Sequence, residues 1–357
     1  MDAALFQENE RTAPVSAGRL VRSIGPMVIR DTLLPNVEIA YETYGQPSLF
    51  HDNAVLICHA LSGDAHAIGW WDRMIGPGKP IDTERYFVIC TNVLGGCQGS
   101  TGPASIAGDG RPYGSRFPMI TVEDMVDAQA LLLSHLGIER LHAVCGGSMG
   151  GMQALAWAVR YPDRVRKVFT TASCAAHSAM QIGFNEVGRQ AILRDPKWNG
   201  GDYDPSDPPA AGLAVARMLG HLSFLSDAAF TQKFDRRLQD RSAFRYDYSA
   251  EFQVESYLRY QGEKFTRRFD ANSLLVLTRA IDYFELTSLD AAEAEFLFVS
   301  YTSDWLYPTA QSAQLQQLAL QAGHRSRHIE IDLPYGHDAF LLDGKIQGEH
   351  VAAFLAE

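Results

Sequence analysis

Residues 141–151, LHAVCGGSMGG, pass directly from an apolar strand through Gly-x-Ser-x-Gly into a helix. This order is typical of a nucleophile elbow, in which a serine lies on a strained turn between a strand and a helix. Glycines two residues before and after the serine let the two backbones approach closely, and Gly146 and Gly150 occupy those places. The pattern predicts that Ser148 projects from the carboxyl end of the strand, where the amide of Met149 can stabilise an oxyanion.

A Gly-x-Ser-x-Gly pattern can also arise by chance in a chain with 30 glycines, where it would mark only a glycine-lined turn. The surroundings favour the elbow. A β-type run comes before the motif, and the Ala-rich run 149–161 that follows has a helical composition and is stopped by Pro162.

The bulk composition indicates an ordinary globular protein. Of 357 residues, 46% are hydrophobic and 20% are charged. The formal net charge of −11 argues against a nucleic-acid surface, which needs a clustered basic face. The first 18 residues lack a basic segment followed by an apolar one, and no apolar run is long enough to span a bilayer. We therefore expect a soluble, cytoplasmic protein with neither a nucleic-acid nor a membrane partner.

The cysteine and histidine patterns do not indicate a metal site. The five cysteines include no C-x-x-C pair and resemble the reduced core residues of a cytosolic protein. No H-x-x-x-H or H-E-x-x-H motif occurs on a predicted helix. We expect no bound metal.

The remaining chain predicts an α/β architecture. Residues 26–30 and 37–44 suggest a hairpin around Pro35 and Asn36, and buried strands follow at 54–58, 86–90, 141–147, 167–171, 294–301 and 328–332. Thr121 should begin a helix that Gly137 ends. Between residues 175 and 290 the pattern is helical, with segments at about 185–195, 209–226, 252–267 and 273–286. We expect a core domain of residues 1–174 and 291–357 and a helical lid domain of residues 175–290.

Two further residues complete a candidate catalytic triad. A serine hydroxyl needs a base, and the base needs a carboxylate that orients it. In elbow enzymes the chain order is Ser, then Asp or Glu, then His. Asp304 follows the strand at 294–301 and His337 follows the strand at 328–332, so both should lie at the edge from which Ser148 projects. A lone acid or histidine in a loop is usually structural, but this order and placement favour catalysis.

These residues predict a serine acyl-enzyme. Ser148 would attack a carbonyl, His337 would take its proton and Asp304 would hold the imidazole ring. The backbone amides of Leu61 and Met149 would form the oxyanion hole, since Leu61 lies in the loop after the third strand. The residues do not specify the acyl donor or acceptor, so transfer and hydrolysis both remain open.

Three further stretches carry a family resemblance. The runs 92–103 (NVLGGCQGSTGP), 145–157 (CGGSMGGMQALAW) and 335–338 (YGHD) resemble the homoserine O-acyltransferases, and the likeness extends from about residue 20 over the rest of the chain. The resemblance implies an α/β-hydrolase fold, a mostly parallel central sheet flanked by helices, with a helical lid inserted before the last strands. It also implies a homodimer that forms through the lid, and no cofactor besides the co-substrate acetyl-CoA.

The same resemblance implies an exchange in two steps. Ser148 takes an acyl group from acyl-CoA, and the hydroxyl of L-homoserine then removes it, giving an intermediate of methionine synthesis. Arg217 would hold the homoserine carboxylate and Asp338 its ammonium group. Without the resemblance, these two residues would pass for a surface arginine on a helix and a solvated aspartate.

The resemblance also bears on the acyl group. Family members that use succinyl-CoA are expected to carry Arg two residues after the triad Asp, and this chain has Leu306 there. An apolar side chain offers nothing to a succinyl carboxylate, which favours acetyl-CoA. A homoserine or serine O-succinyltransferase, an enzyme that acetylates serine or deacetylcephalosporin C, and an esterase or thioesterase with the same triad remain alternatives.

Overall fold

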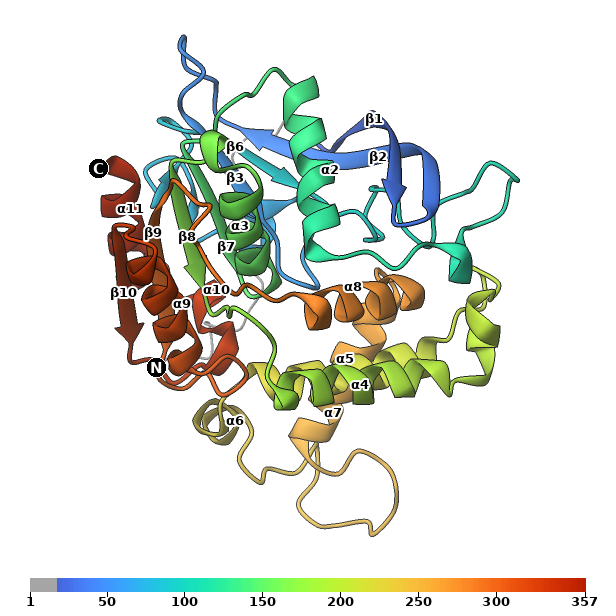
Figure 1. Cartoon of the computed structure of the whole chain (residues 1–357). Helices are drawn as coiled ribbons and strands as arrows, with labels where there is room; N and C mark the ends of the chain where they lie inside the picture. The colour runs from blue at the N-terminus through green and yellow to red at the C-terminus, as the bar shows by residue number, and fades with distance from the viewer. Residues whose placement is uncertain (1–17) are drawn as a thin grey trace.

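An eight-stranded sheet in the order β1-β2-β6-β3-β7-β8-β9-β10 forms the centre of the computed structural model, which describes residues 18–357 (Figure 1). Strand β2 runs antiparallel to its neighbours β1 and β6, and the other pairs are parallel. The strands of this sheet are β1 (Leu20–Ile29), β2 (Thr32–Tyr44), β3 (Ala54–Cys58), β6 (Phe87–Thr91), β7 (Ala143–Gly147), β8 (Lys167–Thr171), β9 (Glu295–Tyr301) and β10 (Ser326–Ile331). Two short strands, β4 (Ile75–Gly76) and β5 (Ile81–Asp82), pair separately.

Both faces of the sheet are buried because its central strands are apolar throughout. In β3, Leu56 and Cys58 belong to the hydrophobic cluster on one face, whereas Val55 and Ile57 belong to the cluster on the other. The first cluster is covered by α2 (Val122–His135), α3 (Met149–Arg160) and α9 (Thr309–Gln321). The second is covered by α1 (Ala67–Trp70), α10 (Ala339–Leu342) and α11 (Ile346–Ala356).

Helix α2 has the ends that its sequence predicts. The Thr121 side chain accepts a hydrogen bond from the amide of Asp124, and the Asp124 carboxylate accepts one from the amide of Thr121. Beyond the last turn, Gly137 adopts φ +73°, the left-handed conformation that commonly ends a helix.

The prediction that the first hairpin turns around Pro35 and Asn36 is wrong. The chain reverses at Arg30, which has φ 53°, and Pro35 lies inside β2. The register places Pro35 and Asn36 opposite the single residue Pro26, between the pairs Gly25–Val37 and Met27–Leu34. This is a β-bulge, where a proline without an N–H removes no ladder hydrogen bond.

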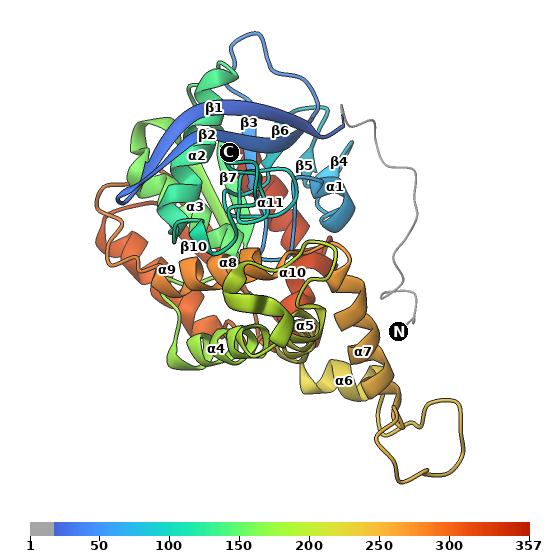
Figure 2. The same ribbon diagram turned by 90° about the vertical axis from the view of Figure 1, so that its right-hand side faces the viewer.

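Between β8 and β9 the chain forms five α-helices, which we call the helical insertion: α4 (Ala179–Leu193), α5 (Ala210–Phe224), α6 (Asp227–Lys233), α7 (Gln253–Thr266) and α8 (Ala271–Tyr283). Figures 1 and 2 show them gathered together beside one edge of the sheet. Four correspond to predicted helical segments, α4 beginning earlier than predicted, whereas the short α6 was not predicted. Within residues 18–357, no helix combines the length and apolarity that a membrane crossing requires.

Candidate active site

The turn between β7 and α3 holds Ser148 at φ 56° and ψ −124°, a strained conformation for a residue with a side chain. Two glycines allow the close packing around it. A Cβ on Gly146 would lie 2.3 Å from the backbone of Gly150, and a Cβ on Gly150 would lie 2.0 Å from the carbonyl oxygen of Cys58. These neighbours are backbone atoms that cannot turn aside, so only glycine fits at either position.

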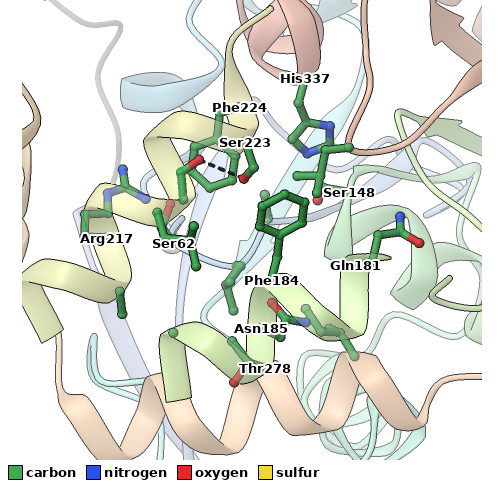
Figure 3. A pocket seen from close by; sticks show the side chains of 18 of the residues that line it. Ser62, Ser148, Gln181, Phe184, Asn185, Arg217, Ser223, Phe224, Thr278 and His337 are labelled. Atoms are coloured by element: carbon green, nitrogen blue, oxygen red, sulfur yellow. Dashed lines mark hydrogen bonds between the residues drawn. The ribbon is translucent and has the colours of Figure 1, made fainter. Parts of the chain in front are cut away.

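Asp304 and His337 form a buried pair at the ends of β9 and β10. Nδ1 of His337 lies 2.8 Å from Oδ2 of Asp304. The other carboxylate oxygen accepts hydrogen bonds from the amides of Leu306 at 3.0 Å and Tyr307 at 2.8 Å. Because an ionised carboxylate only accepts, Nδ1 of His337 carries the proton and Nε2 remains a proton acceptor. Figure 3 shows the His337 ring beside Ser148 in one pocket, so the structure brings the three side chains together.

The helical insertion packs against both loops that carry this pair. Gly336 adopts φ +68°, and a Cβ there would lie 2.5 Å from the amide nitrogen of Ser226. The indole N–H of Trp305 donates to the carbonyl of Leu225 at 3.0 Å. The junction between α5 and α6 therefore supports the chain on either side of the Asp304–His337 pair.

The two predicted oxyanion donors come from neighbouring elements. Met149 is the first residue of α3, so its amide has no acceptor within the helix. Leu61 lies in a turn after β3, closed by a 2.8 Å hydrogen bond from the amide of Gly63 to the carbonyl of Ala60, and its side chain lines the same pocket as Ser148. Both amides thus belong to segments that adjoin the elbow.

Among residues 18–357, the guanidinium group of Arg217 forms no ion pair with a carboxylate. It extends from α5 over the rings of Phe265, 4.6 Å from the centroid, and Phe224, at 5.6 Å. Its Nε atom is buried and has no hydrogen-bond partner among residues 18–357. Burial lowers the pKa of Arg217 to about 10, with Arg268 adding to the effect and Asp338 opposing it. A half-buried cation with an unpartnered nitrogen forms a ready site for an anion.

Asp338 follows His337 directly and faces the same pocket. Burial raises its pKa to about 6, and the nearby His337 and Arg217 oppose that rise. The pocket measures about 140 Å³. Six of the sequence-predicted residues line it: Ser148, His337, Leu61, Arg217, Asp338 and Leu306. The other two, Asp304 and Met149, are buried directly behind it.

Sequence reasoning missed a second buried cluster beside the triad. Nδ1 of His177 lies 2.9 Å from Asp282, and Nε2 lies 2.7 Å from the hydroxyl of Tyr307. Asp282 also accepts hydrogen bonds from Arg189 and Asn185, each at 2.7 Å. The signal that could have drawn attention to it is that His177 follows the carboxyl end of β8, as His337 follows β10.

Other histidines have structural partners. Nε2 of His59 accepts a hydrogen bond from the amide of Val93 at 3.1 Å, and Nε2 of His142 lies 2.8 Å from the carbonyl of Leu355. In the described part of the chain, no group of three or more His, Cys, Asp or Glu side chains is arranged to hold a metal ion.

Comparisons with known proteins identify the fold and the family. Residues 53–343 match the family model of the alpha/beta hydrolase fold. A homoserine O-acetyltransferase of Solidesulfovibrio magneticus is 52% identical over an alignment that covers 94% of this chain and 87% of that protein. The crystal structure of homoserine O-acetyltransferase from Bacillus anthracis superposes with a TM-score of 0.89 at 28% identity, covering 96% of this chain and 98% of that one. The crystal structure of esterase E22 gives a TM-score of 0.88 at 29% identity, covering 96% of this chain and 100% of that one. The chain therefore belongs to the homoserine O-acetyltransferase family of the α/β-hydrolase fold.

Proposed function

We propose that the protein is an L-homoserine O-acetyltransferase of methionine biosynthesis, which passes an acetyl group from acetyl-CoA through Ser148 to the homoserine hydroxyl. The observation that carries this proposal is the presence of Arg217, a cation whose buried Nε atom has no hydrogen-bond partner in residues 18–357, in the same pocket as Ser148 and His337. A cation in the pocket suits an acceptor that carries a carboxylate, as an amino acid does. The names of the relatives point to the same activity.

In the first step, Oγ of Ser148 attacks the thioester carbonyl of acetyl-CoA while Nε2 of His337 takes the hydroxyl proton. Asp304 keeps the proton on Nδ1 and stabilises the imidazolium that forms. The negative charge that develops on the carbonyl oxygen is stabilised by the amides of Leu61 and Met149. The C–S bond then breaks, His337 returns the proton to the sulfur, and CoA leaves an acetyl ester on Ser148.

In the second step, the hydroxyl of L-homoserine takes the place of CoA. His337 accepts its proton, the oxygen attacks the acetyl carbonyl, and the bond to Oγ of Ser148 breaks. His337 then protonates Ser148, and O-acetyl-homoserine leaves. The enzyme returns to its starting state without a cofactor.

Two groups at the pocket suit the ends of an amino acid. The planar guanidinium group of Arg217 fits a carboxylate. A bound carboxylate would give the buried Nε atom the hydrogen-bond partner that it lacks among residues 18–357. Asp338 offers a carboxylate to the ammonium group, next to the base that takes the hydroxyl proton. We propose that they orient homoserine so that its hydroxyl faces the acetyl carbonyl.

The acyl group is proposed to be acetyl. Leu306 lines the pocket and presents an apolar side chain, which would leave a succinyl carboxylate without a partner. A homoserine or serine O-succinyltransferase is the alternative, and competition between acetyl-CoA and succinyl-CoA for acylation of Ser148 separates the two.

Hydrolysis is the second candidate function, because esterase E22 shares the fold with a TM-score of 0.88. The test is release of free thiol from acetyl-CoA with and without L-homoserine. We expect sustained release of thiol only when L-homoserine is present. L-serine, whose side chain is one methylene shorter, is the matched control and should not sustain the release. Equal sustained release without any amino acid would show a thioesterase.

Asp338 predicts a pH dependence of homoserine binding. An ammonium group needs the ionised carboxylate, and a pKa of about 6 means that this form is lost as the pH falls through 6. The KM for homoserine should rise roughly tenfold at one unit below that pKa. Steady-state kinetics at several pH values will check this, with Asp338→Asn as the comparison. The variant should have a raised KM that no longer varies with pH; a wild-type KM that stays flat would exclude the assigned role.

We also propose that the chain has two domains and forms a homodimer. Residues 175–290 would act as a lid domain over a core of residues 1–174 and 291–357, supported by the contacts of α5 and α6 with both triad loops. The insertion also carries exposed apolar side chains, among them Met180, Val187 and Val215, that suit a homodimer interface. A biosynthetic step that consumes acetyl-CoA favours a cytoplasmic enzyme. Light scattering coupled to gel filtration measures the oligomeric state.

A further inference from the structure

We propose that Tyr307 is a positioning residue for acyl transfer, and that the buried pair Asp282–His177 fixes its hydroxyl beside Ser148. The inference rests on the proposed role of Ser148 as nucleophile. It goes beyond that role because it assigns a function to a side-chain cluster outside the triad and connects the helical insertion to the reacting serine.

Tyr307 contacts all three members of the triad. Its amide donates a hydrogen bond to Oδ1 of Asp304 at 2.8 Å. Its ring stacks on the imidazole of His337, with centroids 4.8 Å apart and planes inclined by 21°. Burial raises the pKa of its phenol well above the ordinary value, and a hydrogen bond with the Ser148 side chain opposes part of that rise. The phenol therefore stays protonated and acts as a hydrogen-bonding group, not as a base.

A chain of hydrogen bonds holds the Tyr307 hydroxyl from the other side. The hydroxyl lies 2.7 Å from Nε2 of His177, and Nδ1 of His177 lies 2.9 Å from Asp282. Asp282 pairs with Arg189 at 2.7 Å and accepts a further hydrogen bond from Asn185. The side chains of His177, Asp282 and Arg189 are no more than 5% exposed, so water does not compete for these bonds.

The charge of Asp282 decides which atoms donate in this series of hydrogen bonds. Burial alone would raise the pKa of Asp282, but hydrogen bonds from His177, Asn185 and Arg189 bring it below its ordinary value, so the carboxylate is ionised. An ionised carboxylate only accepts hydrogen bonds, so the imidazole must donate to it. Nδ1–H of His177 then donates to Asp282, and Nε2 accepts the Tyr307 proton. His177 thereby engages the proton of the Tyr307 hydroxyl and fixes its place.

The arrangement repeats that of Asp304 and His337, a carboxylate that fixes the tautomer of an imidazole, but it ends on a phenol. His177 precedes α4, Asp282 lies on α8, and Arg189 and Asn185 lie on α4. Tyr307 lies on the loop after β9, together with Asp304. This series of hydrogen bonds therefore links the helical insertion to the side chains that react, so the position of the insertion affects theirs.

The test begins with Tyr307→Phe, which keeps the backbone bond to Asp304 and the ring stacked on His337 but removes the hydroxyl. We expect the rate of Ser148 acetylation, by p-nitrophenyl acetate or by acetyl-CoA, to fall about tenfold. The KM for homoserine should not change, since Arg217 and Asp338 are untouched. The control is Tyr161→Phe, which removes a tyrosine hydroxyl bonded to Asp127 at 2.9 Å and should keep the wild-type rate.

A double-mutant cycle shows whether His177 acts through Tyr307. His177→Ala alone should slow acetylation, and adding it to Tyr307→Phe should slow it no further. His177→Gln should recover part of the rate, because its amide oxygen can accept the phenol proton. Wild-type acetylation by Tyr307→Phe, or losses that add in the double variant, would overturn the inference. Should Tyr307→Phe not fold, the comparison of His177→Ala with His177→Gln decides, equal rates counting against the proposal. Absence of acetylation in the wild-type protein would instead refute the proposed function.

Discussion

Replacing Ser148 by alanine is expected to reduce turnover of acetyl-CoA and homoserine by about a millionfold, because no other group can form the acyl-enzyme. Folding should be unaffected. Alanine at φ 56° carries the same backbone strain as serine, and the side chain that is lost is a single hydroxyl. Steady-state thiol release measures the activity, and thermal unfolding measures the stability.

The matched control is Ser134→Ala, which removes a hydroxyl from the exposed face of α2, where it bonds to the carbonyl of Ala130. This variant should retain wild-type activity. Turnover by Ser148→Ala at more than a small fraction of the wild-type rate would mean that the acetyl group passes directly from CoA to the acceptor.

Arg217→Ala should separate the two half-reactions. Acetylation of Ser148 should remain close to wild type, because the thioester does not need the guanidinium. The kcat/KM for homoserine should fall roughly a hundredfold to a thousandfold, since the amino-acid carboxylate would lose its charged partner in a buried site. Single-turnover measurements of each half-reaction provide the two rates.

Two further variants sharpen this result. Arg217→Lys keeps the charge but loses the planar fork, so it should recover only part of the second step. Arg160→Ala removes a guanidinium that pairs with Asp127 away from the pocket, and it should leave both steps unchanged. A block of the first half-reaction by Arg217→Ala would mean that this residue binds the acyl donor.

Local sequence signals account for most of the fold. The elbow glycines, the apolar strands and the capping residues of α2 each act over a few neighbouring residues, and the predicted α/β-hydrolase fold is confirmed. The early start of α4 also had a local signal, because Ser178 and Gln181 form a capping box. The hairpin turn was misjudged because a proline in a bulge and a proline in a turn have the same local sequence.

The predicted site residues depend on strand ends and on the family resemblance. Ser148, Asp304 and His337 each follow a parallel strand, and such ends meet at one edge whatever their separation in the chain. Arg217 and Asp338 had no such signal, and only the resemblance singled them out. The buried Nε atom of Arg217 is a property of the tertiary structure alone.

The cluster around Tyr307 could not be predicted from the sequence. His177 lies 105 residues before Asp282 and 130 residues before Tyr307 in the sequence, and the contacts of these residues depend on how α4 and α8 pack against the loop after β9. A tyrosine, a histidine and an aspartate without regular spacing form no motif. Only the tertiary structure shows that their hydrogen bonds end at the triad.

The central claim is a covalent acetyl group on Ser148, and intact-protein mass spectrometry tests it most directly. After brief exposure to acetyl-CoA alone, the protein should gain the mass of one acetyl group, located by peptide mapping on Ser148. L-homoserine should then remove that group much faster than water does, and O-acetyl-homoserine should appear. An unmodified protein that nevertheless forms product, or an adduct that homoserine discharges no faster than water, would contradict the account.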